Sequence, residues 1–179
     1  MRFANWGRIW SFLACILLLF SANAFSYNST AYYSAANFEG RMPSRITAEG
    51  QRVVIVNPRA HAWGAYDAYG NLVRGGEATA GSDWCRDLGH PCHTRSGVFH
   101  IISLGSPYCK STKFPMPYGG APMPYCMYFN HGQALHGSPE GEVVDGNISH
   151  GCVRLHVQDA EWLRYNFVSV GTKVVILPY

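Results

Sequence analysis

One cysteine and two histidines in this sequence have the types and spacing needed for nucleophilic chemistry. Cys152 lies in the run Ser149-His150-Gly151-Cys152-Val153-Arg154, and His136 lies 16 residues before it. A cysteine attacks a carbonyl carbon efficiently when a histidine within hydrogen-bond reach takes the thiol proton. Gly151 allows close backbone approach, so the amides of Gly151 and Cys152 could stabilise the oxyanion that forms. The pattern therefore predicts acyl transfer through a thioester.

The spacing alone leaves two candidates for the base. His150 would share a face with Cys152 in an extended segment, but a tight turn at Gly151 could point it away. His136 is far enough along the chain to come from a neighbouring strand. Because proximity in sequence does not establish geometry, both histidines remain candidates at this point.

The segments that must position these side chains are typical of a mostly β domain, a sandwich or a barrel. Short β-branched or alternating runs predict strands, and turn signals such as Asn57-Pro58 and Tyr69-Gly70-Asn71 separate them. The predicted strands cover residues 52–57, 60–68, 72 onward, 97–103 and 172–177.

A single helix and a single long loop complete the predicted elements. Residues 157–167 place Ala160, Leu163 and Phe167 on one helical face, with acidic residues in the first turn and Gly171 beyond the end. Residues 106–124 are rich in proline and glycine and predict a long loop. Loops of this length in compact domains are often lids or binding walls.

The first 24 residues have the pattern of a secretory signal peptide. Arg2 and Arg8 precede a short apolar run, and Ser21-Ala22-Asn23-Ala24 is typical of a cleavage site. The apolar run is shorter than the roughly 20 residues that a membrane span needs. We therefore expect cleavage after Ala24, no stable membrane insertion afterwards and a periplasmic or secreted protein. An N-terminal arm over residues 25–49 would then precede a folded domain over residues 50–179.

Composition limits the partners that this domain could have. The chain has 179 residues, of which 47% are hydrophobic and 14% charged, so it can bury a sizeable core as one domain. Loss of the leader would remove two of the 14 basic residues and none of the 11 acidic ones, leaving a nearly neutral protein. Nucleic acid is an unexpected partner for such a chain, because no basic stripe is present to neutralise phosphates.

Five cysteines remain after the leader, and in an oxidising compartment most of them should pair. Closing short loops costs the least entropy, which favours Cys85 with Cys92 and Cys109 with Cys126, although sequence does not fix connectivity. Cys152 would then be the free thiol. The alternative is zinc, bound by Cys85, His90, Cys92 and His93 or by His131, His136, His150 and Cys152. Neither set has the paired spacings of structural zinc sites, so we expect no metal.

The residues that carry the chemistry also match a known family. His136-Gly137 followed by Ser149-His150-Gly151-Cys152-Val153-Arg154 resembles the signature of the L,D-transpeptidases of the YkuD type, and the likeness extends over roughly residues 50–179. Arg95 departs from it, because the family commonly has proline there. The paired cysteines around the long loop are also unusual and indicate a specialised lid. With its Tyr32-Tyr33 arm, the chain is most similar to secreted enhanced-entry proteins of intracellular Gram-negative pathogens.

The resemblance implies a β-sandwich enzyme of cell-wall biogenesis and cell shape that needs no cofactor. It would cleave a peptidoglycan stem tetrapeptide between the L-centre of its diamino acid and the terminal D-alanine. In the role assignment that it implies, Cys152 is the nucleophile, His136 is the base and later the acid, and the Gly137 carbonyl orients the imidazole. The amides of His150, Gly151 and Cys152 would form the oxyanion hole, with Ser149 as a supporting hydrogen-bond partner. Arg154 would either hold a substrate carboxylate or brace the loop, and Tyr118 and Tyr128 would wall the groove.

Several functions remain open on sequence alone. An amine acceptor from another stem would give cross-linking, whereas water would give an L,D-carboxypeptidase. A different class is a non-catalytic protein on the same fold that binds the cell wall or contacts a host-cell surface. Retention of both Cys152 and His136 argues against that class. A papain-like peptidase would place the cysteine before its histidine, which is the reverse of the order here.

Overall fold

The computed structural model describes residue 1 and residues 40–179, and the statements below concern these residues. The predicted signal peptide beyond Met1 and the first part of the predicted arm, residues 25–39, lie outside them. The rest of the arm packs on the domain, because Met42 is buried and the hydroxyl of Tyr66 donates a hydrogen bond to the carbonyl of Pro43. Among the described helices, none combines the length and the apolar character needed to cross a bilayer.

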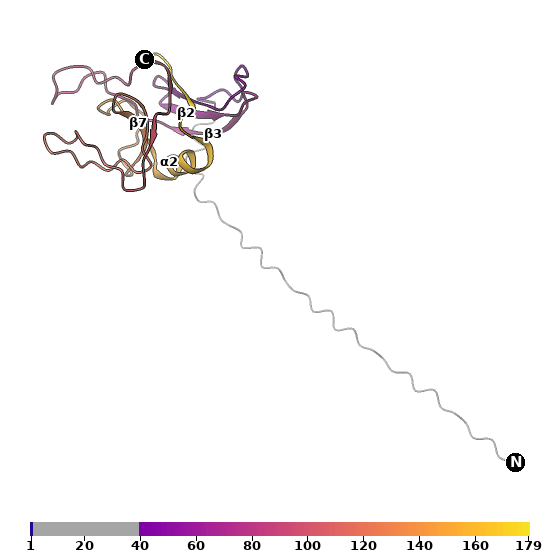
Figure 1. The fold of residues 1–179 in the computed structure, drawn as a ribbon. Coiled ribbons are helices and arrows are strands. Elements are labelled where there is room, and N and C mark those ends of the chain that lie inside the picture. The colour runs from indigo at the N-terminus through magenta and orange to yellow at the C-terminus, as the bar shows by residue number, and fades with distance from the viewer. Residues whose placement is uncertain (2–39) are drawn as a thin grey trace.

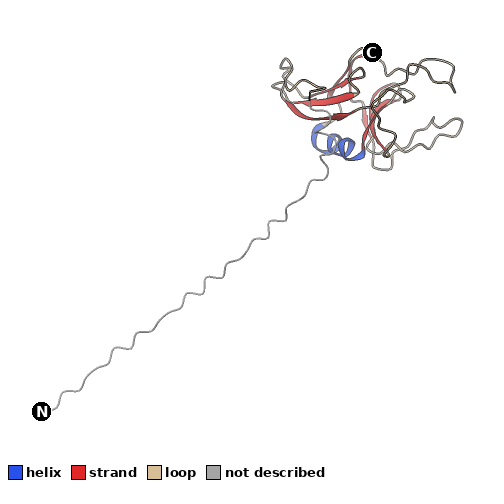
Figure 2. Ribbon diagram, turned by 180° about the vertical axis from the view of Figure 1, so that it is seen from behind, coloured by secondary structure: helices blue, strands red, loops and turns tan. Residues whose placement is uncertain are grey.

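Within residues 40–179, nine strands form two sheets (Figures 1 and 2). The first sheet has the order β3-β2-β1-β9-β4 and the second has the order β5-β6-β7-β8. The strands of the first sheet are β1 (Val53–Asn57), β2 (Ala62–Tyr66), β3 (Leu72–Glu77), β4 (Gly97–His100) and β9 (Lys173–Ile176). Those of the second are β5 (Ser103–Leu104), β6 (Met127–Asn130), β7 (Gln133–Ser138) and β8 (Val153–His156). The fold is therefore mostly β, as predicted.

The largest core lies between the two sheets and uses residues from both. Val54, Val56 and Trp63 of the first sheet and Leu135 and Val153 of the second belong to this one buried cluster. Each of these side chains has essentially no exposed surface, so their burial supplies the dispersion and hydrophobic terms that hold the sheets together.

The predicted helix over residues 157–167 is present, with a change of pitch along its length. It begins as α2 (Val157–Trp162) and continues as the π-helical turn η2 (Leu163–Phe167). Ala160, Leu163 and Phe167 are buried against the core, as the apolar spacing predicts. Helix α2 follows β8 directly and packs on β7, so it supports the two strands that carry the reactive residues.

Two predicted strands differ from the observed ones. The predicted strand 60–68 is shorter, because residues before β2 form a turn in which His61 has a φ of 48°. The predicted strand 97–103 divides into β4 and β5, which belong to different sheets. At this crossing the amide of Ile101 bonds to Thr172 beside the first sheet, while that of Ile102 bonds to Tyr128 in the second.

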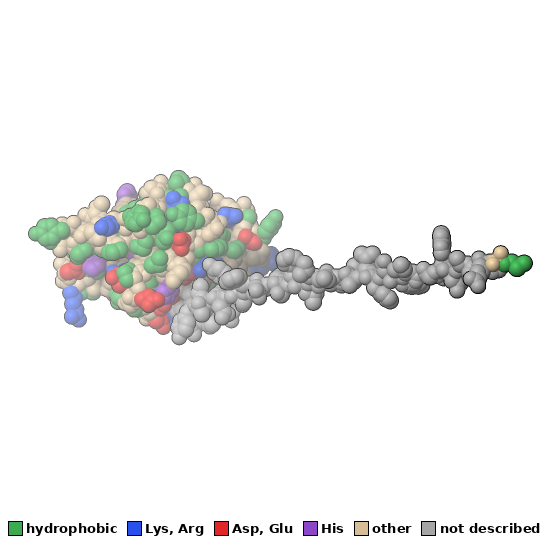
Figure 3. Space-filling view, turned by 90° about the horizontal axis from the view of Figure 1, so that it is seen from below, with side chains coloured by type: hydrophobic (Ala, Val, Ile, Leu, Met, Phe, Trp, Pro, Cys, Tyr) green, Lys and Arg blue, Asp and Glu red, His purple; other side chains and the backbone are tan. Residues whose placement is uncertain are grey.

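Both predicted disulfides are present and each closes a loop. Cys85–Cys92 closes a short loop after β3, and Cys109–Cys126 closes the long loop before β6. We call these the 85–92 loop and the lid, the latter covering residues 106–124. Figure 1 shows both extending from the same side of the sandwich. On the face shown in Figure 3, basic and acidic side chains are interspersed, so this face carries no continuous basic stripe.

Candidate active site

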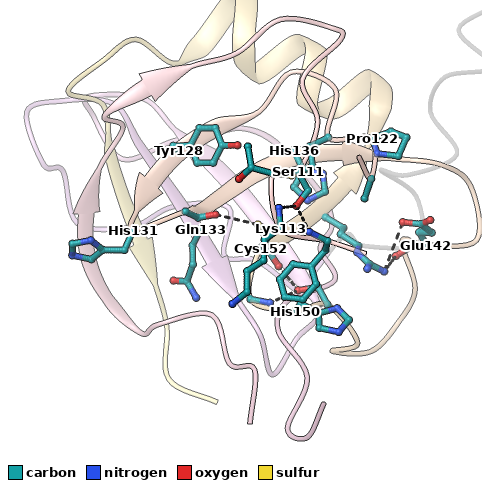
Figure 4. Close-up of a pocket in the computed structure, with 18 residues that line it drawn as sticks. Ser111, Lys113, Pro122, Tyr128, His131, Gln133, His136, Glu142, His150 and Cys152 are labelled. Atoms are coloured by element: carbon teal, nitrogen blue, oxygen red, sulfur yellow. Dashed lines mark hydrogen bonds and ion pairs between the residues drawn. The ribbon is translucent and has the colours of Figure 1, made fainter. Parts of the chain in front are cut away.

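Two neighbouring parallel strands bring the predicted reactive residues together. In the register of β7 and β8, His136 lies opposite Arg154, and Cys152 directly precedes β8. Because side chains alternate along a strand, Cys152 lies on the same face as Arg154 and next to His136. All three residues line one cavity of about 480 Å³ (Figure 4).

The His136 imidazole is buried and neutral. Its Nδ1 lies 2.8 Å from the carbonyl oxygen of Gly137, to which it donates a hydrogen bond. Burial, reinforced by the positive charge of Arg154, lowers the pKa of His136 to about 4. With the proton on Nδ1, the Nε2 atom has a free lone pair at neutral pH, as a general base requires.

The Cys152 thiol is the one free cysteine among the described residues. Its Sγ lies 3.7 Å from the carbonyl oxygen of Gly132. Burial raises the pKa of Cys152 above its usual value, although a backbone hydrogen bond at Ala134 and the charge of Arg154 act in the opposite direction. The resting site therefore holds a thiol beside a neutral imidazole, so deprotonation must accompany attack on the substrate.

The turn before the nucleophile is held by Ser149. Its hydroxyl donates to the carbonyl of Cys152 and accepts a hydrogen bond of 3.1 Å from the amide of Gly151. Gly151 has a φ of 116°, a conformation that favours glycine. The buried Thr94 hydroxyl also donates to the carbonyl of Gly151, at 3.0 Å.

These contacts correct the predicted oxyanion hole. The amide of Gly151 is already bonded to Ser149, so it is not available to a substrate oxygen. The amides of His150 and Cys152 have no such partner among the described residues. Of the three predicted donors, these two remain.

The His150 side chain points away from the thiol and contacts both disulfide-closed loops. Its Nε2 lies 2.9 and 3.1 Å from the two carboxylate oxygens of Asp87 in the 85–92 loop. Its ring lies 4.4 Å from the ring of Phe114 in the lid. In the view of Figure 4, His136 lies above Cys152 and His150 lies below it. Of the two candidate bases, the geometry favours His136.

The predicted substrate-binding residues divide into two groups. Arg154 lines the cavity, with Nη1 3.8 Å from a carboxylate oxygen of Glu142. Tyr128 also lines it, from β6, and burial together with the nearby Cys152 raises its pKa. The prediction that Tyr118 walls the groove is wrong, because this residue is 93% exposed on the lid and does not line the cavity.

Several residues of the site carry no signal in the sequence pattern. Lys113 and Phe114 reach the cavity from the lid, and Glu142 reaches it from the β7–β8 connection. Gln133 braces one wall, since its carboxamide accepts from the amide of Arg95 and donates to the carbonyl of His93. The positions of Lys113, Phe114 and Glu142 depend on loop conformation, which neither periodicity nor motif spacing specifies, whereas Gln133 is the first residue of β7.

One group of side chains could be considered as a metal site. Ligand atoms of Cys85, Asp87 and His150 lie within 4.8 Å of one another. The sulfur of Cys85 is bonded to Cys92, however, so it is not a thiolate ligand in this structure. The alternative zinc set that included Cys85 and Cys92 is likewise replaced by their disulfide.

Comparison with protein-family models matches residues 51–176 to YkuD, the L,D-transpeptidase catalytic domain. No curated protein gave a significant match. Among solved structures, an L,D-transpeptidase from Xylanimonas cellulosilytica is 21% identical, with a TM-score of 0.62, over 79% of this chain and 68% of that one. An L,D-transpeptidase from Mycobacterium smegmatis is 22% identical, with a TM-score of 0.58, over 72% of this chain and 59% of that one.

A third similar structure has a ligand in its description. It is L,D-transpeptidase 3 from Mycobacterium tuberculosis in complex with a faropenem-derived adduct, 22% identical with a TM-score of 0.56. The alignment covers 71% of this chain and 60% of that one. The chain thus spans less than two thirds of the two mycobacterial structures, and at these identities the likeness shows a shared fold.

Proposed function

Because this chain belongs to the YkuD family of L,D-transpeptidase catalytic domains, we propose that it transfers acyl groups between peptidoglycan stem peptides. The observation that carries the proposal is the placement of Cys152 and His136 on one face of two paired strands, in one cavity. A nucleophile and its base in this arrangement can form and resolve a thioester.

In the first half-reaction, Cys152 attacks the carbonyl carbon between the diamino acid and the terminal D-alanine. Nε2 of His136 takes the thiol proton as the S–C bond forms, while the Gly137 carbonyl holds the Nδ1 proton. The amides of His150 and Cys152 are the donors available to the tetrahedral oxyanion. When the C–N bond breaks, His136 gives its proton to the departing amine, which leaves D-alanine and a thioester.

In the second half-reaction, the same imidazole activates the acceptor. An amine of another stem peptide loses its proton to His136 as it attacks the thioester, and the proton then returns to the sulfur. The products are a cross-linked peptide and the free thiol. Water in place of the amine would give a carboxypeptidase, and the choice depends on which acceptor reaches the thioester.

We also place this activity outside the cytoplasm, in the periplasm or after secretion. Two disulfides close the loops around the cavity, which fits an oxidising compartment, and the leader sequence fits export. Host-cell contact, the resemblance to enhanced-entry proteins and a non-catalytic wall-binding role stay predictions from the sequence.

The test is intact-protein mass spectrometry after incubation with a purified disaccharide-tetrapeptide, with free D-alanine measured in parallel. We expect an adduct of the wild-type protein and D-alanine release, both absent from a folded Cys152→Ala variant. Faropenem serves as a second probe of the thiol, by analogy with the Mycobacterium tuberculosis adduct. A folded wild-type protein with a free thiol that gives no adduct and no D-alanine would refute the proposal and favour the binding protein.

A further inference from the structure

The cavity carries more positive than negative charge on its lining side chains. Among its described lining residues, Lys113 and Arg154 are cationic side chains, whereas Glu142 is the single acidic one. His136 adds no charge at neutral pH, because burial lowers its pKa to about 4. A cavity with this balance favours an anionic ligand over a neutral one.

The two cations are not equivalent. Arg154 lies opposite His136 in the strand register, close to the thiol, and its guanidinium is 3.8 Å from the Glu142 carboxylate. Lys113 comes from the lid and forms no ion pair with a described carboxylate. Its ammonium group lies 5.2 Å from the centre of the Phe114 ring. Lys113 is therefore the cation of the cavity whose charge no described carboxylate neutralises, and it is available to an anionic ligand.

Hydrogen bonds, a ring contact and a disulfide fix the segment of the lid that carries Lys113. The amides of Lys113 and Phe114 both donate to the Ser111 hydroxyl, at 3.2 and 2.8 Å. The Phe114 ring packs against His150, which in turn bonds to Asp87 in the 85–92 loop. The lid itself is closed by the Cys109–Cys126 disulfide. Lys113 is thus presented at the cavity from an anchored backbone.

A donor stem peptide can present carboxylates on both sides of its reacting bond. One is the terminal carboxylate of D-alanine, and the other is on the side chain of a diamino acid that is also a dicarboxylic acid. A single cation near the thiol can bind one of them. A second cation that reaches the cavity from a different element, the lid, is suited to the other.

We infer that Lys113 is a specificity-determining residue that binds the side-chain carboxylate of the donor's diamino acid, while Arg154 binds the terminal carboxylate. The inference rests on the proposed function and narrows its substrate class. The preferred donor carries a free carboxylate on that side chain, and a donor with the corresponding primary amide is a poorer substrate.

The test compares kcat/KM for two donor tetrapeptides that differ only in this group, carboxylate or primary amide, by D-alanine release. A charge-assisted hydrogen bond to an accessible lysine predicts that the wild type prefers the carboxylate by about tenfold, mainly through KM. In Lys113→Gln the ratio of the two kcat/KM values should fall toward one, and in Lys113→Arg it should persist. The preference should also weaken as salt is raised.

Lys110→Gln is the matched control. Lys110 lies in the same loop, where its backbone forms an isolated β-bridge with Pro122, but it does not line the cavity. This variant should keep the wild-type ratio. Equal use of both donors by the wild type, or an unchanged ratio in Lys113→Gln, would overturn the inference and leave the transpeptidase proposal standing. Failure of the wild type to release D-alanine from either donor would instead reject both.

Discussion

The buried His136 makes the stability of this protein depend on pH in a defined window. Burial lowers the pKa of His136 in the folded protein to about 4, whereas a histidine in an unfolded chain has a pKa of about 6.5. Between these two values the unfolded chain binds the proton more readily than the folded one. The stability that comes from the neutral imidazole is therefore complete above pH 6.5 and is lost progressively as the pH falls toward 4.

The size of this effect follows from the difference between the two pKa values. It corresponds to about 3 kcal/mol of unfolding free energy. That is a large fraction of the roughly 5 to 15 kcal/mol typical of a folded domain. We expect urea midpoints to fall markedly between pH 7 and pH 4.5.

The assay is urea unfolding at several pH values, with wild type compared with His136→Gln. Exposed carboxylates such as Asp87 and Asp145, whose pKa values are lowered by their hydrogen-bond partners, titrate in both proteins and largely cancel in the comparison. The variant lacks the imidazole, so the wild type should lose about 2 kcal/mol more than the variant between pH 7 and pH 4.5, which is most of the full effect. Parallel stability curves for the two proteins would show that the imidazole does not titrate as its burial implies.

Three further changes test the architecture around the nucleophile. Gly151→Ala should slow Cys152 acylation about tenfold or more because of its φ of 116°, while Gly146→Ala, whose added Cβ would make only an ordinary contact with the side chain of Val144, should not; equal rates would contradict this. Thr94→Val should lower the unfolding free energy by about 2 kcal/mol, because two buried hydrogen bonds are lost, and Thr94→Ser should restore it in urea titrations. Replacing Cys85 and Cys92 by serine should lower the unfolding free energy by about 2 kcal/mol relative to oxidised wild type in urea titrations, and this difference should vanish under reducing conditions, which open both disulfides.

Local patterns were sufficient to predict the framework of the fold. The β-branched run before Asn57 forms β1, and the apolar spacing of residues 157–167 forms the helix. Closure of short loops was enough to pair Cys85 with Cys92 and Cys109 with Cys126. These features depend on neighbouring residues, so a single sequence contains the information needed to find them.

Contacts between distant segments account for most of what the sequence could not predict. The bond between His150 and Asp87 joins residues 63 positions apart. The engagement of the Gly151 amide by Ser149 is local, but it depends on a turn geometry that spacing does not define. The lid has no periodicity, which is why Lys113 was missed and Tyr118 was placed on the wrong surface. The crossing at Ile101 depends on hydrogen bonds to two different sheets.

The residues that would carry out the chemistry and those that would select the donor lie on different parts of this fold. The distance between the thiol and the imidazole is set by the backbone ladder of adjacent strands, whereas Lys113 and Phe114 come from a loop outside both sheets. If Lys113 has the proposed role, substitutions at this position in the lid would alter which donor peptide is preferred without changing the strands that hold Cys152 and His136. Evolution could therefore change the substrate preference of such a protein through substitutions in its loops, because each variant would retain the strands that hold Cys152 and His136.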